Sequence, residues 1–477
     1  MNDSDLIAAL LAIPAETQSI EFKRLGAGNN EVSRIVESVV AMANAEGGTV
    51  VLGISDPSAG KGNARLLGIE ENLEAYDALG REIQRIVPPL SYIWPPQLVA
   101  LPNGKRIALV NVPKAADHFR SCNNHVYIRQ ERSNRLLTPQ EIVTFAYAKG
   151  FEKADRELVD VDFSLLDTGT FRLWRNARKL SDDVLPQILK ITGLARENQS
   201  GKLQPTRAAV LLFAEHPTAV MDTKCAIRVF QYAGTIETLT ETLNLIGTPT
   251  TIEGPVVRQI QEAHDYILTL LRSGIRVPSG FVTQYRLPER AVKEAITNAV
   301  IHRDYFVKRD IEIKIFEDRL EIESPGLLPY NITRSNIGYV RSDGYRNDLL
   351  VKHLRDFPSP PNLDQNEGVR AMRHDMNSRN LYPPIFFTYP FLQDAVRVVL
   401  LNETVATEWQ KVSTYLKATK YISNEEARSI TGIVQRDKMA KILKGWVRQG
   451  LLMQIKPASG YVRKTKYRLP DTTELTR

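Results

Sequence analysis

Three carboxylates near the start of the chain have the types and spacing to hold a divalent metal ion. Glu16 and Glu21 lie five residues apart, and Asp56 follows shortly after an apolar run. Mg²⁺ and Mn²⁺ prefer carboxylate oxygens, and a metal held by two or three carboxylates is the usual apparatus for cutting phosphodiesters. The pattern therefore predicts metal-dependent chemistry on a nucleic acid, with Lys23 or Arg129 balancing the phosphate charge.

A strand–helix–strand unit would position these acids. Residues 19–23 alternate between polar and apolar side chains, as a half-buried strand does, and residues 31–45 have helical spacing. Two glycines end the helix, and the apolar, β-branched run over residues 49–54 favours a second strand. Such a unit would bring Asp56 close to Glu21. The alternative is that the acids are ordinary surface carboxylates paired with a neighbouring lysine.

Residues from about 14 to 145 resemble the Schlafen-type AlbA-like domain. The resemblance rests on short motifs, which are Glu21-Phe22-Lys23, Asn44-Ala45-Glu46-Gly47-Gly48, Leu52-Gly53-Ile54-Ser55-Asp56, Gly68, Tyr127-Ile128-Arg129, and Leu136, Thr138 and Glu141. In nuclease members of the family, Glu16, Glu21 and Asp56 would fall on the catalytic acids. The resemblance therefore implies an AlbA-like α/β domain over residues 1–150 that cleaves structured, tRNA-like RNA with Mg²⁺ or Mn²⁺.

The same resemblance leaves a non-catalytic alternative. Animal members carry two such lobes and a structural zinc site, whereas this chain has one lobe and two cysteines, Cys122 and Cys225. A homodimer would restore the two-lobed arrangement. Many bacterial chains with this domain are described as DNA-binding regulators, so the domain alone does not specify catalysis.

A second group of polar residues lies on a predicted helix in the middle of the chain. Glu294, Asn298 and His302 recur every fourth residue and share one helical face among apolar neighbours. Such a stripe faces a ligand or a satisfied hydrogen-bond network. An Asn can orient a magnesium ion, and a Glu one turn earlier can activate a water molecule. The alternative is a structural network that fixes the turn at residues 303–305.

This helix resembles the N-box of the GHKL ATPase fold, as found in the divergent ATPase-like domain that commonly follows the Schlafen-type domain in bacteria. A predicted hairpin over residues 311–322 agrees with it. The resemblance implies a GHKL-like α/β sandwich over residues 160–403 that binds ATP, with Asn298 as a metal ligand. The residues implied to bind the cofactor are Glu294, Asn298, His302, Gly326, Asn347 and Gly368.

Two departures from the GHKL pattern leave the ligand open. Ser324 replaces the adenine-reading Asp of the family, and the second glycine motif keeps one glycine, Gly368. A lid with fewer glycines offers fewer free amides to phosphates. Weak ATP binding, another nucleotide and retention of the fold alone all agree with the sequence. Within this module, residues 206–213 are predicted as a buried strand and residues 254–271 as a helix.

The positive charge of the chain is concentrated at its end. The net charge is +7, yet residues 405–477 contain 15 Lys and Arg against 6 Asp and Glu, a balance of +9, and the rest carries −2. Clustered positive charge favours a polyanion partner through counterion release.

The pattern of residues 405–477 resembles a winged helix-turn-helix. Ser423 and Glu426 have the spacing of a capping box that opens a short helix, and a basic helix follows from about residue 434 to 448. Residues 451–455 and 461–469 would form the wing. The predicted nucleic-acid contacts are Arg129 and, on the basic helix, Arg436, Lys438, Lys441, Lys444 and Arg448. The alternative is a protein-docking winged helix with solvated lysines.

Composition places the chain among ordinary globular proteins and predicts an α+β multidomain fold. A length of 477 residues suggests about three domains. No apolar run approaches the ~20 residues of a membrane helix, the start lacks the basic region of a signal peptide, and two cysteines argue against a disulfide framework. We therefore expect a cytoplasmic, homo-oligomeric protein with RNA or DNA as partner and no membrane association.

Three functions fit these observations. The first is a metal-dependent endoribonuclease, regulated by the nucleotide-binding domain and suited to defence or stress response. The second is a non-catalytic transcriptional regulator, in which the winged helix binds an operator and the central domain senses ATP or another ligand. The third is an ATPase that remodels a partner, and the degenerate glycine motifs favour it least.

Overall fold

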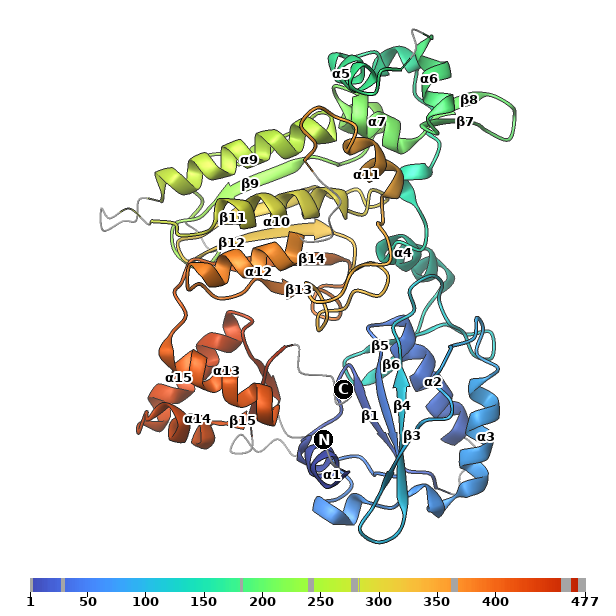
Figure 1. Ribbon diagram of the computed structural model, residues 1–477, viewed down its shortest axis with the longest axis vertical. Coiled ribbons are helices and arrows are strands. Elements are labelled where there is room, and N and C mark those ends of the chain that lie inside the picture. Colours follow the sequence, from blue (N-terminus) through green and yellow to red (C-terminus); the bar gives the residue numbers. More distant parts are fainter. Residues whose placement is uncertain are drawn as a thin grey trace. The chain divides into compact units, whose positions relative to one another are not determined.

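The computed structural model describes residues 3–26, 31–180, 183–238, 244–275, 282, 284–361, 368–455 and 465–470. The chain divides into two compact units. One contains residues 1–144, 333–336 and 406–477, and the other contains residues 145–332 and 337–405. The sequence predicts three domains, whereas this division gives two units. The boundaries of the three domains stay a prediction. Mixed helices and sheets throughout confirm the α+β multidomain class (Figure 1).

The N-terminal lobe is built on a four-stranded sheet in the order β1-β2-β4-β3, with β1 and β2 parallel as the strand–helix–strand reading predicts. A separate hairpin, β5–β6, packs beside α2. The elements are α1 (Asp3–Ala12), β1 (Ile20–Lys23), α2 (Glu31–Asn44), β2 (Gly48–Leu52), α3 (Leu73–Ile83), β3 (Gln97–Ala100), β4 (Arg106–Val112), β5 (Tyr127–Gln130), β6 (Ser133–Leu136) and α4 (Pro139–Lys149), with short 3₁₀ helices at Gly62–Arg65 and Ile69–Glu71.

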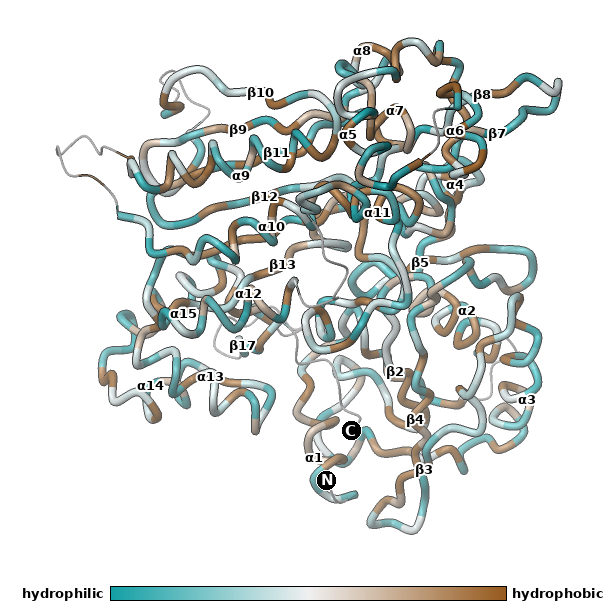
Figure 2. Tube along the Cα trace, turned by 45° about the horizontal axis from the view of Figure 1, so that its top comes forward, coloured by the Kyte–Doolittle hydropathy of each residue, from teal (hydrophilic) through white to brown (hydrophobic). Residues whose placement is uncertain are grey.

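Both faces of this sheet are buried, because its strands are apolar at consecutive positions. Val50 and Leu52 point into one core with α2 and α3, whereas Val51 between them points into a second core with α1. Figure 2 shows the matching brown, apolar stretch along β4. A strand buried on both faces is held in a fixed register, so the ends of β1 and β2 are firmly placed.

The other unit centres on a six-stranded sheet in the order β10-β9-β11-β12-β14-β13. Helices α9, α10 and α12 cover one face of it (Figure 1). The strands are β9 (Ile227–Gln231), β10 (Thr250–Ile252), β11 (Ile311–Ile315), β12 (Arg319–Pro325), β13 (Ile385–Phe387) and β14 (Ala395–Leu401). The covering helices are α9 (Val256–Ser273), α10 (Glu289–Ile301) and α12 (Gly368–Ser378), and α11 (Asp348–Leu354) lies between the last two in the sequence. This is the α/β sandwich that the sequence predicts.

A smaller helical part precedes the sheet in the same unit. It contains α5 (Gly169–Ala177), α6 (Leu185–Ile191), β7 (Ala195–Glu197), β8 (Leu203–Pro205), α7 (Arg207–Phe213) and α8 (Pro217–Val220), with 3₁₀ helices at Ala154–Arg156 and Phe163–Leu166. The strand predicted over residues 206–213 is wrong, because this segment is the helix α7. Thr206 caps it by accepting a hydrogen bond from the amide of Ala209, and every residue from Ala208 to Phe213 is buried.

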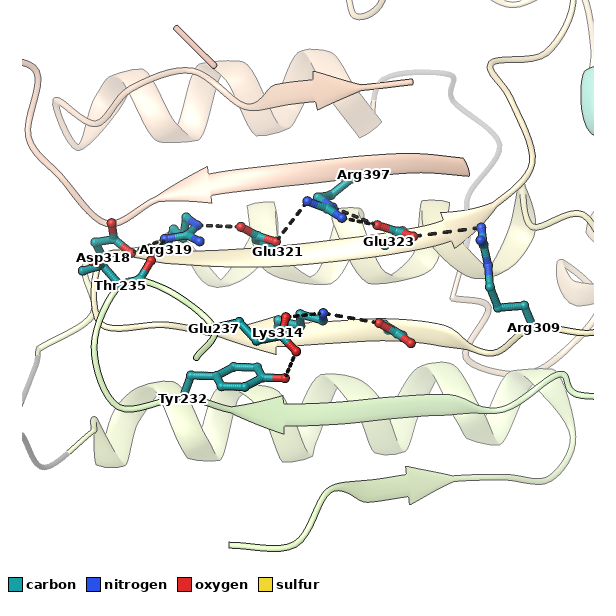
Figure 3. Close-up of polar contacts among 11 residues, drawn as sticks. Tyr232, Thr235, Glu237, Arg309, Lys314, Asp318, Arg319, Glu321, Glu323 and Arg397 are labelled. Carbon is teal, nitrogen blue, oxygen red and sulfur yellow. Dashed lines mark hydrogen bonds and ion pairs between the residues drawn. The ribbon is translucent and has the colours of Figure 1, made fainter. Parts of the chain in front are cut away.

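The open face of the six-stranded sheet carries a ladder of ion pairs (Figure 3). Arg397 bonds Glu323 directly opposite on β12 at 2.6 Å and lies 3.7 Å from Glu321, and Arg319 holds the other oxygen of Glu321 at 2.6 Å. Cross-strand pairs of opposite charge stabilise a sheet and keep its solvated face polar.

One buried carboxylate in this unit makes its stability depend on pH. Asp155 is fully buried and accepts hydrogen bonds from the amides of Leu349 and Leu350, at the start of α11. Burial raises the pKa of Asp155 from 3.8 to about 6. Since the folded pKa is above the unfolded value, the stabilisation is complete below pH ~3.8 and is lost as the pH rises through ~6.

We expect Asp155→Asn, which keeps an acceptor but cannot titrate, to gain stability relative to the wild type as the pH rises from about 4 to 7. The relative gain has an upper limit of about 3 kcal/mol, from the size of the pKa shift. Urea unfolding of both proteins at several pH values measures it. A difference that stays constant with pH would contradict this role.

The C-terminal segment forms three helices and a small antiparallel sheet in the order β15-β17-β16. Its elements are α13 (Thr407–Thr419), β15 (Ile422–Ser423), α14 (Asn424–Thr431), α15 (Arg436–Arg448), β16 (Met453–Ile455) and β17 (Lys466–Arg468). The predicted capping box is present, because Ser423 and Glu426 bond each other's backbone amides. The order of these helices and strands is the one expected of a winged helix, and that assignment stays a prediction. Of the predicted wing, residues 461–464 lie outside the described residues.

None of the helices in the described part of the chain is both long and apolar enough to cross a membrane.

Candidate functional site

A cavity of about 520 Å³ lies between α10, the end of β12 and the start of α12. The predicted polar stripe of α10 forms one wall of it, since Glu294, Asn298 and His302 all line the cavity. Gly326 and Gly368, which are distant in sequence, line it as well. The opposite walls are apolar, and their residues include Leu327, Leu328, Ile332, Ile337, Met372, Phe386 and Val398. A largely apolar cavity with a few converging polar groups is the usual form of a small-molecule site.

The polar end of the cavity is tightly built around Gly368, the first residue of α12. A side-chain carbon at Gly368 would lie 2.7 Å from Oε2 of Glu294 and 3.0 Å from Nδ2 of Asn298. Nδ2 of Asn298 is buried and has no hydrogen-bond partner among the described residues. An unsatisfied buried amide costs free energy, which a ligand acceptor would recover. Burial raises the pKa of Glu294 above its ordinary value.

His302 presents a neutral imidazole to the cavity. Burial, followed by the positive charges of Arg346 and Lys153, lowers the pKa of His302 to about 4. Its ring stacks on Tyr345 with centroids 5.5 Å apart, and Nδ1 has no partner within the described part of the chain. A neutral ring with a free nitrogen can donate to or accept from a ligand without carrying charge.

The remaining predicted cofactor residue, Asn347, is not among the residues that line the cavity. It is fully buried and donates hydrogen bonds to the carbonyls of Ile301 and Arg303. Asn347 therefore fixes the turn after α10 through these backbone carbonyls. Ser324, at the position of the adenine-reading Asp, commits its hydroxyl to the carbonyl of Ala299 at 2.7 Å.

Gly368→Ala should weaken ligand binding without unfolding the protein. The added methyl would push Glu294 and Asn298 aside, and a misplaced polar group of this kind lowers affinity by about 10-fold or more. Gly445→Ala in α15 is the matched control, because no heavy atom lies within 4 Å of its new methyl. The control should keep full affinity and gain about 0.5–1 kcal/mol of stability. Equal affinity of the two variants for the probe Mg²⁺–ATP in calorimetry would contradict the role of Gly368.

The acidic cluster of the N-terminal lobe has a different character. Glu21 lies in β1 with 3 % of its surface exposed, and both carboxylate oxygens are ion-paired. Oε1 lies 2.5 Å from Nζ of Lys23, and Oε2 pairs with the guanidinium of Arg129, which is fully buried in β5. Ser38 of α2 adds a hydrogen bond to Oε1 at 3.2 Å.

The other two predicted catalytic acids are close to Glu21 but have partners of their own. Glu16 accepts a hydrogen bond from the amide of Phe22 at 2.9 Å, and Asp56 accepts one from the amide of Ser58 at 2.7 Å. Burial raises the pKa of Glu16, and the negative charges of Glu21 and then Asp56 raise it further. The three acids therefore share one electrostatic environment.

This environment also contains a cation that the sequence analysis missed. Arg65 is 2 % exposed, its guanidinium lies 4.8 Å from the ring centre of Phe22, and it donates to the carbonyl of Ser55. Burial lowers its pKa, and the charges of Asp56 and Glu16 oppose that change. Nothing in the local pattern of residues 62–65 marks this role, because the partners of Arg65 come from distant segments.

The residues of this cluster do not fit a divalent metal as they stand. Three buried or half-buried cations, Lys23, Arg65 and Arg129, accompany three acids, whereas a metal site needs excess negative charge and free carboxylate oxygens. Across the described residues no group of three Asp, Glu, His or Cys side chains is placed to hold a metal ion. The prediction that Arg129 contacts nucleic acid is not supported, because its guanidinium is buried against Glu21.

The basic helix α15 presents its cations to solvent. Arg436, Lys438, Lys441, Lys444 and Arg448 are all exposed, while Met439, Leu443 and Trp446 of the same helix are buried. Lys441, Lys444 and Arg448 lie three and four residues apart and therefore share one face. No acidic partner of these five cations is found within the described part of the chain.

Comparisons with known proteins agree with the two resemblances. Residues 16–138 match the Schlafen, AlbA_2 family model. Residues 308–400 match a family model described as "Putative ATP-dependent DNA helicase recG C-terminal". The first match spans all three acids of the AlbA_2 domain. The second runs from just before β11 to β14 and begins after the polar stripe of α10. The recognition of a Schlafen AlbA_2 domain followed by a recG-type domain is confirmed.

Two solved structures are similar to the chain at low sequence identity. One is the crystal structure of the DIP2311 protein from Corynebacterium diphtheriae, at 18 % identity and a TM-score of 0.38, covering 98 % of both chains. The other is the solution structure of the N-terminal domain of a RecG-related protein from Nitrosomonas europaea, at 23 % identity and a TM-score of 0.18, covering 24 % of this chain and 74 % of that one. No curated protein matches the chain.

Proposed function

We propose that this protein is a nucleic-acid-binding regulator whose hold on nucleic acid is controlled by a nucleotide bound in the recG-type unit. The observation that carries the proposal is the solvent-facing basic stripe of α15. It lies on the second helix of a helix-turn-helix, the element that enters a groove of DNA in proteins of this architecture. A Schlafen AlbA_2 match and a match to a DNA helicase family support the same partner class.

The cavity beside α10 is the proposed nucleotide site. The free amide of Asn298 and the close approach of Gly368 fit the polar end of a nucleotide, and the apolar walls fit a base. Magnesium bound with the nucleotide would neutralise phosphate charge, with Asn298 and Glu294 as the residues to hold it. His302 would contact the ligand as a neutral donor or acceptor. ATP is the nucleotide that the resemblance implies.

Control by the nucleotide follows from thermodynamic linkage. If nucleotide favours the conformation that binds nucleic acid, nucleic acid favours nucleotide binding by the same factor. A transcriptional regulator that binds its operator as a dimer is the fitting biological form, since a two-fold protein reads a two-fold site.

A metal-dependent endoribonuclease acting on tRNA-like RNA is the second candidate. One observation favours it, namely that the charges of Glu21 and Asp56 both act on Glu16, so the three acids lie near one another. The cations that accompany these acids weigh against it. We therefore place it below the regulator.

Two assays on the full chain separate the candidates. The regulator should bind duplex DNA or structured RNA in EDTA and leave it intact. The nuclease should cleave total tRNA when Mn²⁺ is present and lose that cleavage in Glu21→Gln. Intact nucleic acid with Mn²⁺ together with tight binding in EDTA supports the regulator, and Glu21-dependent cleavage supports the nuclease.

A further inference from the structure

We infer that Arg129, Lys23 and Arg65 are built-in cations that take the place of a divalent metal at the acidic cluster of the AlbA_2 domain. This domain would then act on nucleic acid without a metal of its own. The inference deepens the proposed function and rests on it for the identity of the partner. The experiment below measures metal binding only. The metal inference and the proposed nucleic-acid-binding function can therefore fail independently.

Glu21 is the centre of the argument because its carboxylate is fully engaged. Lys23 holds one oxygen at 2.5 Å and Arg129 holds the other. Displacing Arg129 would leave its guanidinium buried without a counter-charge, and displacing Lys23 would break a 2.5 Å ion pair to the buried Glu21. Breaking a buried ion pair in this way is strongly unfavourable.

Arg129 is locked into this position by further contacts. Its guanidinium donates to Oδ1 of Asn134 at 3.0 Å and to the carbonyl of Thr17 at 3.3 Å, and its own carbonyl accepts from Gln18 at 2.8 Å. Asn134 in turn donates to the hydroxyl of Ser38 at 2.8 Å. These contacts hold the guanidinium of Arg129 against Glu21.

The charge balance extends to the other two acids. Arg65 lies close enough to Asp56 and Glu16 for their charges to act on its pKa, and the charge of Lys23 lowers the pKa of Glu16. Bringing a doubly charged ion among three fixed cations adds repulsion at short range, in a region where burial limits screening.

Mn²⁺ binding to the nucleotide-free full chain tests this inference. The signal of free Mn²⁺ in electron paramagnetic resonance gives the number of ions bound to the wild type, Glu21→Gln, Asp56→Asn and Arg129→Gln. We expect the wild type, Glu21→Gln and Asp56→Asn to bind Mn²⁺ alike. Arg129→Gln, which frees one oxygen of Glu21, should bind Mn²⁺ about 10-fold more tightly than the wild type.

A wild-type Mn²⁺ site that is lost in Glu21→Gln or Asp56→Asn would overturn the inference, as would a folded Arg129→Gln with no gain in affinity. Glu21→Gln and Arg129→Gln both alter a buried ion pair to which Asp56 does not belong. If those two variants do not fold, Asp56→Asn still tests the inference. Circular dichroism establishes folding before each titration. Tight nucleic-acid binding in EDTA is measured separately and bears on the proposed function.

Discussion

Replacing Lys441 and Lys444 of α15 by alanine should weaken binding of nucleic acid by about 30-fold near physiological salt. Each lysine that contacts a phosphate releases about one counterion, so the slope of log affinity against log salt should fall by about two. Both side chains are exposed, on the opposite side of α15 from its buried residues Met439, Leu443 and Trp446. Alanine preserves the helix, so folding should be unchanged. Fluorescence anisotropy with a labelled duplex at several salt concentrations measures both quantities.

Lys411→Ala with Lys417→Ala in α13 is the charge-matched control. These two lysines are also exposed on a helix of the same C-terminal segment, and their loss lowers the net charge by the same amount. The α13 variant should lose little affinity. If both double variants weaken binding equally, the effect is one of overall charge, and α15 is not the contact helix.

Asn298→Ala should lower nucleotide affinity by about 10- to 100-fold. The buried amide of Asn298 has no partner within the described residues, so a ligand acceptor would supply its first hydrogen bond, and hydrogen bonds to charged groups contribute about 1.5–3 kcal/mol. Removing an amide that has no protein partner should leave the free energy of unfolding nearly unchanged. Isothermal calorimetry with Mg²⁺ and ATP measures the change.

Asn377→Ala on the exposed end of α12 is the control for this variant, because it removes the same amide from a helix outside the cavity lining. Its nucleotide affinity should equal that of the wild type. A calorimetric titration that shows the same affinity for Asn298→Ala would contradict the assignment of the cavity.

Local patterns in the sequence predicted much of this structure. The stripe of Glu294, Asn298 and His302 was recognisable because helix periodicity alone places the three residues on one face. The capping box of Ser423 and Glu426 was also predictable from local sequence, because the two residues lie within one turn of each other.

Roles that depend on distant partners were beyond the sequence. Arg129 was predicted to contact phosphate, yet it pairs with Glu21 from a different strand and is fully buried. The sequence around Arg65 did not indicate its place in the acidic cluster, because Arg65 packs on Phe22, which is distant in sequence. Asn347 matched a family position, and the structure uses it to hold backbone carbonyls.

The wrong prediction of a strand over residues 206–213 has a physical reason, because a segment buried on all sides carries no hydrophobic period in its sequence. The segment is apolar at nearly every position, so neither the two-residue period of a strand nor the period of a helix is visible. Capping by Thr206 and the tertiary packing around α7 decide in favour of the helix.

The most direct test of the proposed function is whether a nucleotide changes the affinity of the full chain for nucleic acid. Anisotropy titrations of a labelled duplex and a labelled tRNA, with Mg²⁺ and with or without a non-hydrolysable ATP analogue, give the coupling. We predict a change in affinity of about 5-fold or more in the wild type, and no change in Asn298→Ala. Identical affinities in the wild type, while calorimetry shows the analogue bound, would contradict the central claim that the nucleotide controls nucleic-acid binding.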